Sequence, residues 1–248
     1  MDHLEHSDVS RYLDAVAARF EGRGREAQLG RAPFVTISRE SGALGRRLAD
    51  AVIERLKARG GPLAHGWETF DRHLLAMLAG DPKLKFPLRE LVGEEYHSRV
   101  YDYIHQLFTW STPQDIVQKR VLHALISVAA TGRVVIVGRA GALVTRGLKR
   151  GVHIRLVAST RTRVENVARR DHVSEEEALW RVRDLERSRL AFARKYLGHD
   201  LADPRHYDAV FNVDRVDLQD VAEWIVERVA ALEALAQAPS QRAASSAY

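Results

Sequence analysis

The chain has 248 residues, of which 46% are hydrophobic and 29% charged, and it contains no cysteine. This length and composition are typical of one globular domain with a sizeable core, and the lack of cysteine excludes disulfides and thiolate metal sites. No apolar run approaches the roughly 20 residues that span a bilayer, and the first residues, MDHLEHSDVSRYLDAV, lack a secretory apolar region. We therefore expect a cytoplasmic protein that does not insert into membranes.

The net charge of +5 points to an anionic partner, which could be a nucleic acid, an anionic surface or a small molecule. Much of the excess lies late in the chain, in RTRVENVARR and RVRDLERSRLAFARK. Aromatic residues are only 7% of the chain and do not alternate with these arginines, as a stacking surface for single strands would require. The pattern favours small anionic molecules over nucleic acid.

The first half of the chain begins with an amphipathic pattern that predicts a helix over 8–22. The apolar run FVTIS (34–38) predicts a strand, and the spacing of the apolar residues after it predicts a helix over 45–59. The segment ARGGPLAHG is expected to turn and to form a short second strand. Helical patterns follow over 71–80 and 88–110, with GDPKLKFP as a break between them.

In the second half, Thr112 and Pro113 form an N-cap and first-turn pair for a helix to about residue 130. We expect three further strands, in RVVIVGRAG, which ends in a glycine loop, in VHIRLVAS and in YDAVFNV. A helix is expected from about residue 162, and Ser174 with Glu177 forms a capping box for another through residue 196. Asp217 opens a terminal helix to about residue 236, and the polar tail 237–248 is expected to be disordered.

Strands that alternate with helices in this way predict a mostly parallel sheet with helices on both faces. Ligands of such sheets bind at the carboxyl ends of the strands. Glycine loops follow two of these ends, after Ile37 and after Val137. The sequence therefore predicts a ligand site where these two loops converge.

The first loop, ESGALGRR, has the strand, glycine loop and helix layout of a phosphate-binding loop. Gly42 and Gly45 supply the glycines, but Arg46 stands where a lysine is expected and Arg47 where a serine or threonine is expected. Ser38 and Ser41 are nearby hydroxyls that could substitute. From spacing alone, the loop is either a phosphate cradle with altered chemistry or an ordinary turn between a strand and a helix.

Four segments, in order, resemble the cytidylate kinase-like family: TISRESGALGRRLADAVIERL, VVIVGRAGALV, VSEEEALWRVRDLERSRLAFARKYLG and DPRHYDAVFNV. The resemblance runs from about residue 34 to residue 231. It implies a three-layer P-loop-like α/β domain over 31–236. Residues 1–30, which lie outside the resemblance, are expected to form a helical extension and a linker. The resemblance also implies a helical acceptor-binding insert at about 71–112 and an arginine-rich lid at about 161–200.

The resemblance further implies transfer of a phosphoryl group from ATP to CMP or dCMP, with magnesium bound as MgATP and no dedicated protein ligand. It assigns ATP phosphate binding to the first loop and its hydroxyls (Ser38, Ser41, Gly42, Gly45 and Arg46) and acceptor binding to Asp71 and Arg139. Arg46, Arg187 and Arg194 are the expected catalytic residues, since converging arginines stabilise the charge of phosphoryl transfer.

Alternatives remain open for the chain as a whole. Glu40, Leu44 and Arg47 depart from the family pattern, and no acidic residue follows the third strand, which is compatible with a protein that binds a nucleotide without turnover. A kinase for another small acceptor is a further alternative. The helix over 8–22 has an apolar face that must pack on its own core or on a second copy of the chain. Single residues also have simpler interpretations. Asp71 could act only as a helix N-cap. The lid arginines could form a solvated helix face that pairs with nearby acidic residues.

Overall fold

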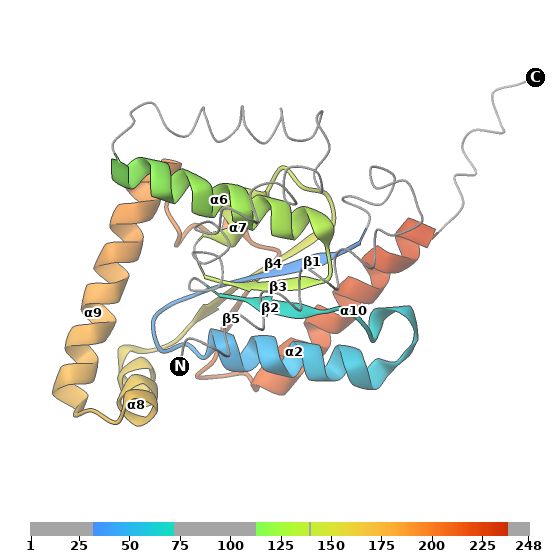
Figure 1. The fold of residues 1–248 in the computed structure, drawn as a ribbon. Coiled ribbons are helices and arrows are strands. Elements are labelled where there is room, and N and C mark those ends of the chain that lie inside the picture. The colour runs from blue at the N-terminus through green and yellow to red at the C-terminus, as the bar shows by residue number, and fades with distance from the viewer. Residues whose placement is uncertain (1–31, 72–112, 139, 238–248) are drawn as a thin grey trace, which may run out of the picture.

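The computed structural model describes residues 32–71, 113–138 and 140–237. The helices expected over 8–22, 71–80 and 88–110 lie outside these residues, as do Thr112, Arg139 and the tail. Within them the chain forms a three-layer α/β fold, with one sheet between two layers of helices (Figure 1). This confirms the fold class that the alternation of strands and helices predicted.

Five parallel strands form the sheet, in the order β2-β3-β1-β4-β5. Their bounds are β1 Phe34–Arg39, β2 Glu68–Phe70, β3 Val134–Val137, β4 Gly151–Val157 and β5 Ala209–Asn212. Because all five run in one direction, the loops that follow β1, β3 and β4 gather at a single edge of the sheet. The sheet thereby brings together segments more than 100 residues apart, as in the pairing of Ser38 with Arg155.

Helices cover both faces of the sheet, and a helical hairpin stands at its carboxyl edge (Figure 1). α2 and α10 lie on one face, and α6 and α7 on the other. α8 and α9 form the hairpin and follow the carboxyl end of β4. Their bounds are α2 Gly45–Arg59, α6 Pro113–Thr131, α7 Gly141–Thr145, α8 Thr160–Asp171, α9 Glu175–Phe192 and α10 Leu218–Gln237, with short helical turns at Gly61–Leu63, Ala193–Leu197 and Pro204–His206.

From Val35 to Ser38, side chains along β1 alternate between apolar residues, which face the core on one side of the sheet, and polar residues, which are buried on the other side. Val35 and Ile37 belong to the apolar core between the sheet, α2 and α10. Thr36 and Ser38 point to the other face, as the period of two requires, and both are buried. The sequence therefore places hydroxyls inside the protein at the end of its central strand.

Helix caps appear where the sequence predicted them. The Ser174 side chain accepts a hydrogen bond from the Glu177 amide at the start of α9, and Asp217 accepts one from Gln219 before α10. α8 begins at Thr160, slightly earlier than expected, because Ser159 is its N-cap and accepts from the Thr162 amide. Such caps satisfy amides that the helix itself leaves unpaired.

The prediction of a second strand within ARGGPLAHG (58–66) was wrong. This segment forms the end of α2, a helical turn at Gly61–Leu63 and bends, and the strand is the next segment, Glu68–Phe70. Gly60 and Gly61 both have φ of +70°, and Pro62 lacks an amide donor, so this segment cannot form a regular strand. The β-branched and aromatic residues Thr69 and Phe70 suit the pleated sheet better.

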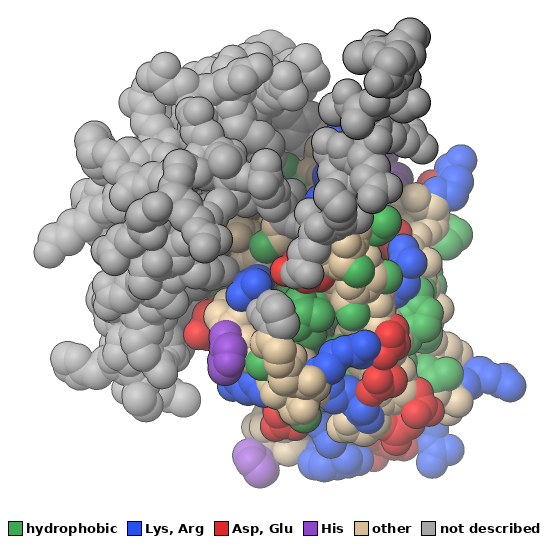
Figure 2. Space-filling model, turned by 90° about the vertical axis from the view of Figure 1, so that its right-hand side faces the viewer, with side chains coloured by type: hydrophobic (Ala, Val, Ile, Leu, Met, Phe, Trp, Pro, Cys, Tyr) green, Lys and Arg blue, Asp and Glu red, His purple; other side chains and the backbone are tan. Residues whose placement is uncertain are grey.

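Ion pairs join α2 to α10 on the outer surface. Arg55 pairs with Glu223, and Arg59 pairs with Glu227. Figure 2 shows one face of the molecule, on which basic and acidic side chains lie among one another instead of forming a patch of one sign. Within the part of the chain that the structure describes, no helix is long and apolar enough to cross a membrane.

Candidate anion-binding site

Two glycine loops meet at the carboxyl edge of the sheet, as the sequence predicted. The first joins β1 to α2, and the second joins β3 to α7. The amide of Gly138 in the second loop donates a hydrogen bond of 2.9 Å to the carbonyl of Ile37 at the end of β1. The two loops are therefore neighbours, which is the geometry that a shared ligand site requires.

Each loop ends in a residue with a left-handed backbone. Leu44 has φ of +61° directly before α2, and Ala140 has φ of +55° directly before α7. Residues with a side chain rarely adopt this conformation, and such strained residues cluster at functional sites. The repetition of the same feature in both loops is an observation that spacing alone could not provide.

Helix α8 packs directly on the first loop at Gly42. A Cβ atom added to Gly42 would lie 2.4 Å from the carbonyl oxygen of Arg163, and its φ is +87°. The side-chain amide of Asn166 donates a hydrogen bond of 2.9 Å to the Gly42 carbonyl. Gly42 is thus required by packing and backbone conformation, and α8 fixes the position of the loop.

Glu40, which departs from the usual phosphate-loop pattern, has a structural role. Its carboxylate accepts a hydrogen bond of 3.0 Å from the amide of Ala158 after β4. The Nε atom of Arg163 lies 3.6 Å from the same carboxylate. Glu40 therefore ties the first loop to the junction of β4 and α8.

A carboxylate from α9 binds the first loop. Oε1 of Glu186 accepts a hydrogen bond of 2.5 Å from the backbone amide of Ser41, and one of 3.1 Å from Nη1 of Arg189. An amide of this loop thus donates to an anionic oxygen in the structure itself, as a phosphate-binding loop does.

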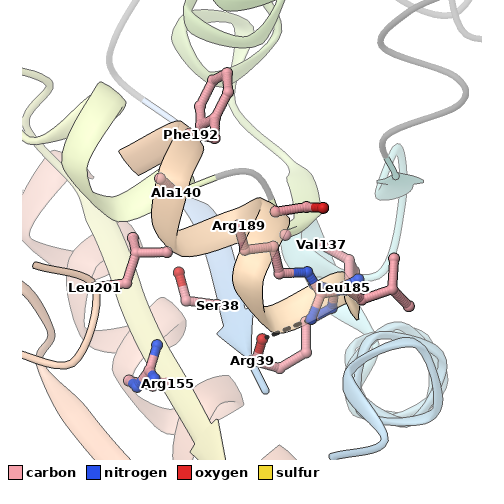
Figure 3. A pocket seen from close by; sticks show the side chains of 11 residues that line it. Ser38, Arg39, Val137, Ala140, Arg155, Leu185, Arg189, Phe192 and Leu201 are labelled. Atoms are coloured by element: carbon pink, nitrogen blue, oxygen red, sulfur yellow. Dashed lines mark hydrogen bonds between the residues drawn. The ribbon is translucent and has the colours of Figure 1, made fainter. Parts of the chain in front are cut away.

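Beside the first loop, a pocket of about 210 Å³ opens between the sheet edge and α9 (Figure 3). Three arginines from three different elements line it: Arg39 from β1, Arg155 from β4 and Arg189 from α9. None of the described residues that line the pocket is acidic. A concentration of positive charge without carboxylates in the lining suits an anionic ligand.

Among the described residues, two buried groups of this pocket have no hydrogen-bonding or acidic partner. Ser38 is 5% exposed, and its Oγ atom makes no hydrogen bond. Arg155, its register partner on β4, is 8% exposed, and its guanidinium lies 5.8 Å from the ring centre of Tyr207. Burying a hydroxyl or a cation without such a partner costs free energy. An anion bound in the pocket would supply the partner and reduce this cost.

The third pocket cation, Arg39, lies next to Arg189. Nη1 of Arg189 donates a hydrogen bond of 3.4 Å to the Arg39 carbonyl (Figure 3). Burial, followed by the charge of Arg189, lowers the pKa of Arg39 to about 9, while the charge of Glu186 opposes the change. The guanidinium therefore keeps its charge at neutral pH, although it is partly desolvated.

The structure joins two residues that the sequence assigned to different substrates. Nη1 of Arg46 forms an ion pair of 2.6 Å with Oδ2 of Asp71, so the expected ATP residue and the expected acceptor residue are in contact. The Arg46 side chain is 69% exposed and comes from the first turn of α2. Arg46 does not line the pocket described above.

The lid arginines selected from the sequence do not line the pocket. Leu185, Arg189 and Phe192 line the pocket, whereas Arg187 and Arg194 are exposed. At about 100° per residue, position 187 lies roughly opposite the face centred between 185 and 192, and Arg194 lies beyond the end of α9, in the helical turn Ala193–Leu197. The arginine that α9 and its continuation contribute to the pocket is therefore Arg189, and catalytic roles for Arg187 and Arg194 stay predictions.

Sequence reasoning missed Arg39, Arg155 and Arg189, although a signal existed for two of them. Arg39 directly follows an apolar strand, which is the property that selected Arg139, and Arg155 is a charge inside a mostly apolar strand. Nothing in the spacing distinguished Arg189 from its neighbours on α9. Arg139 lies outside the described residues, and the residues on either side of it, Gly138 and Ala140, line the pocket.

Metal ligands are not grouped in the described part of the chain. No three or more histidine, aspartate or glutamate side chains there are placed to hold one ion together. Side-chain oxygen atoms at the first loop include the hydroxyls of Ser38 and Ser41 and the carboxylates of Glu40 and Glu186, and both carboxylates are engaged in the contacts described above.

The fold and the site define a parallel α/β protein with an arginine-lined pocket beside two glycine loops. The sequence matches the cytidylate kinase-like family over residues 34–215, and the chain belongs to that family. This confirms the family that the four sequence segments indicated. Comparison with curated protein sequences gives no match.

Among solved structures, the fold resembles that of an uncharacterized protein from Eubacterium ventriosum ATCC 27560, with a TM-score of 0.61 and 18% identity. The match covers 80% of this chain and 98% of that one. A gluconokinase from Sinorhizobium meliloti 1021 matches with a TM-score of 0.40 and 14% identity, over 83% of this chain and 95% of that one. At 18% identity, the first of these matches shows a shared fold.

Proposed function

We propose that the protein is a phosphotransferase that moves the γ-phosphoryl group of ATP to CMP or dCMP. Membership of the cytidylate kinase-like family supports this reaction class. The observation that carries the proposal is the convergence of Arg39, Arg155 and Arg189 on one pocket beside the first glycine loop. The choice of CMP or dCMP rests on the family, since the predicted acceptor insert lies outside the described residues.

Phosphoryl transfer fits this site because its demands are mainly positioning and charge stabilisation. The bond between the γ-phosphorus and the bridging oxygen breaks, its electron pair leaves with ADP, and an oxygen of the acceptor phosphate forms the new bond. No general base is needed, because a phosphate monoester has a second pKa of about 6 and is already a nucleophile at neutral pH. Arginines around the transferred group would stabilise the negative charge on its oxygens.

The two substrates would bind to different parts of the carboxyl edge of the sheet. Backbone amides of the first loop, including those of Ser41, Gly42 and Gly45, would hold the ATP phosphates at the start of α2. Asp71 and Arg139 would hold the acceptor, and the ion pair of Asp71 with Arg46 would fix the aspartate. Magnesium, when bound through phosphate oxygens, water and the Ser38 or Ser41 hydroxyl, would neutralise charge on the transferred group.

The test is a coupled assay of ADP release with MgATP and each of CMP, dCMP, UMP and AMP. It compares the wild type with Arg189→Ala and with Arg183→Ala as a matched control. Arg183 is exposed on the same helix, on the side away from the pocket, so both variants lose one positive charge from α9. We expect turnover that depends on the acceptor, falls by about 100-fold in Arg189→Ala, and is retained in Arg183→Ala.

Absence of turnover with all four acceptors, from folded wild-type protein, would contradict the proposal for these acceptors. ATP binding without turnover would then support the alternative of a nucleotide-binding protein without kinase activity. The engagement of Arg46 by Asp71 and of Ser41 by Glu186 is the observation that keeps this alternative open. Equal loss of turnover in the two arginine variants would contradict a specific role for the pocket.

A further inference from the structure

Both glycine loops leave space for the side chain of one residue, Arg39. A Cβ atom added to Gly45, at the start of α2, would lie 3.1 Å from Cγ and Cδ of Arg39. A Cβ atom added to Gly138, after β3, would lie 3.2 Å from Nη1 of Arg39. Both distances are shorter than nine in ten contacts of real Cβ atoms, so the lack of a side chain at both glycines makes room for the Arg39 side chain.

This arrangement places the Arg39 guanidinium between the two loops. Its stem crosses the first turn of α2, and its charged end lies beside Gly138 and lines the pocket. Figure 3 shows the Arg39 side chain next to that of Arg189. In this view Arg155 lies farther away, on the other side of Ser38. No hydrogen bond joins the Arg39 guanidinium to another residue in the part of the chain that is described. The group therefore has donors available for a ligand.

Arg46 offers a weaker candidate for the same role. Its side chain is 69% exposed, and it already forms an ion pair with Asp71. Arg39 belongs to a central strand of the sheet and keeps its charge at neutral pH, with its pKa lowered to about 9 chiefly by burial. A partly desolvated cation interacts with phosphate more strongly than one in water.

We propose that Arg39, and not Arg46, takes the place of the missing phosphate-loop lysine and holds the phosphoryl group between the two glycine loops. This inference rests on the proposed function and specifies which cation the reaction uses. Arg39 neither gives nor takes a proton. The P–O bonds that break and form are those of the ATP-to-acceptor transfer described above, and Arg39 binds the oxygens of the transferred group throughout.

The first experiment measures binding of inorganic tripolyphosphate by calorimetry, together with ADP release, in Arg39→Met and Arg46→Met. Methionine keeps most of the apolar stem of each arginine and removes the charge. We expect Arg39→Met to weaken tripolyphosphate binding at least tenfold and to lower kcat about 100-fold. Arg46→Met should change tripolyphosphate binding less than threefold.

Gly45→Ala provides a second variant in case Arg39→Met folds poorly. The nearest heavy atoms to the added Cβ all belong to Arg39, and the φ of Gly45 is not in the left-handed region, so alanine should favour α2 while it displaces the Arg39 stem. We expect unchanged or higher thermal stability with weaker tripolyphosphate binding. Partial restoration of turnover in Arg39→Ala by added guanidinium ion, at concentrations that do not unfold the protein, would identify a direct chemical role.

The outcomes separate this inference from the proposed function. Turnover and tripolyphosphate binding that survive in Arg39→Met but not in Arg46→Met would overturn the inference and leave the proposed function standing. Tripolyphosphate binding that depends on Arg39, without turnover from any acceptor, would support the inference on the phosphate site and contradict the proposed reaction. No tripolyphosphate binding by the folded wild type would overturn the inference, whereas the proposed function would still be decided by acceptor-dependent ADP release.

Discussion

Glu186 on α9 and Ser41 in the first glycine loop are joined by a hydrogen bond between a carboxylate and a backbone amide. They are 145 positions apart in the chain. The Glu186 carboxylate accepts a hydrogen bond from the Ser41 amide, which in the proposed function would bind a phosphate oxygen. The carboxylate also accepts a hydrogen bond from Arg189. A bound phosphate would therefore have to displace Glu186 or share its donors.

Glu186→Gln should strengthen the binding of inorganic tripolyphosphate. The substitution removes the negative charge that competes for the Ser41 amide and that offsets the charges of Arg39 and Arg189. Hydrogen bonds to charged groups contribute about 1.5–3 kcal/mol, so we expect an increase in affinity of about tenfold, measured by calorimetry at low salt. Glu176→Gln, at an exposed position in the first turn of α9, is the charge-matched control. An equal gain in both variants would show a general charge effect and contradict a direct competition.

Arg155→Met should separate binding from stability. A buried cation without a carboxylate partner contributes little to folding, and replacing it with an apolar side chain is often neutral or stabilising. We expect an unchanged or raised Tm without ligand, and a smaller rise in Tm when tripolyphosphate is added. Thermal unfolding with and without tripolyphosphate measures both effects, with Arg215→Met at an exposed position as the control. A large loss of Tm without ligand would instead show that the contact of Arg155 with Tyr207 holds the fold.

The sequence predicted the fold well because its signals are local. Apolar runs and helical spacing identified β1, α2, β3 and β4, and side-chain caps identified the starts of α9 and α10. The second strand was misplaced because three residues, Glu68–Phe70, carry almost no periodicity of their own and are held by their pairing with β3.

The site was harder to predict because it depends on contacts between distant segments. The meeting of the two glycine loops followed from the parallel sheet, but the side of α9 that faces the pocket depends on how the hairpin of α8 and α9 packs. Spacing placed Arg187 and Arg194 on one face without showing that Arg189 lies on the face toward the pocket. The path of Arg39 between Gly45 and Gly138 likewise requires the tertiary structure.

Gly42→Ala should destabilise the protein, because α8 leaves no space for a side chain at this position. The added Cβ would lie 2.4 Å from the Arg163 carbonyl oxygen, and the residue has φ of +87°. Backbone strain and the clash together should lower the free energy of unfolding by roughly 2–4 kcal/mol, measured by urea denaturation. Gly147→Ala is the matched control, since no heavy atom lies within 4 Å of its added Cβ. It should change the free energy by no more than about 0.5 kcal/mol, and equal losses in both variants would contradict the packing argument.

His153 should make the folded state sensitive to mild acid. Its Nδ1 atom lies 2.8 Å from the Thr36 hydroxyl inside the protein, and burial lowers its pKa from 6.5, although Asp208 opposes the change. Below pH 6.5 the unfolded chain takes up a proton on this residue before the folded protein does, so the free energy of unfolding falls as the pH falls. The slope of this single group cannot exceed about 1.4 kcal/mol per pH unit. Urea denaturation of the wild type and His153→Asn between pH 7.5 and pH 5.5 isolates it, because asparagine can still bond to Thr36 but does not titrate. The wild type should lose more stability than the variant over this range, and parallel losses would mean that other groups cause the acid sensitivity.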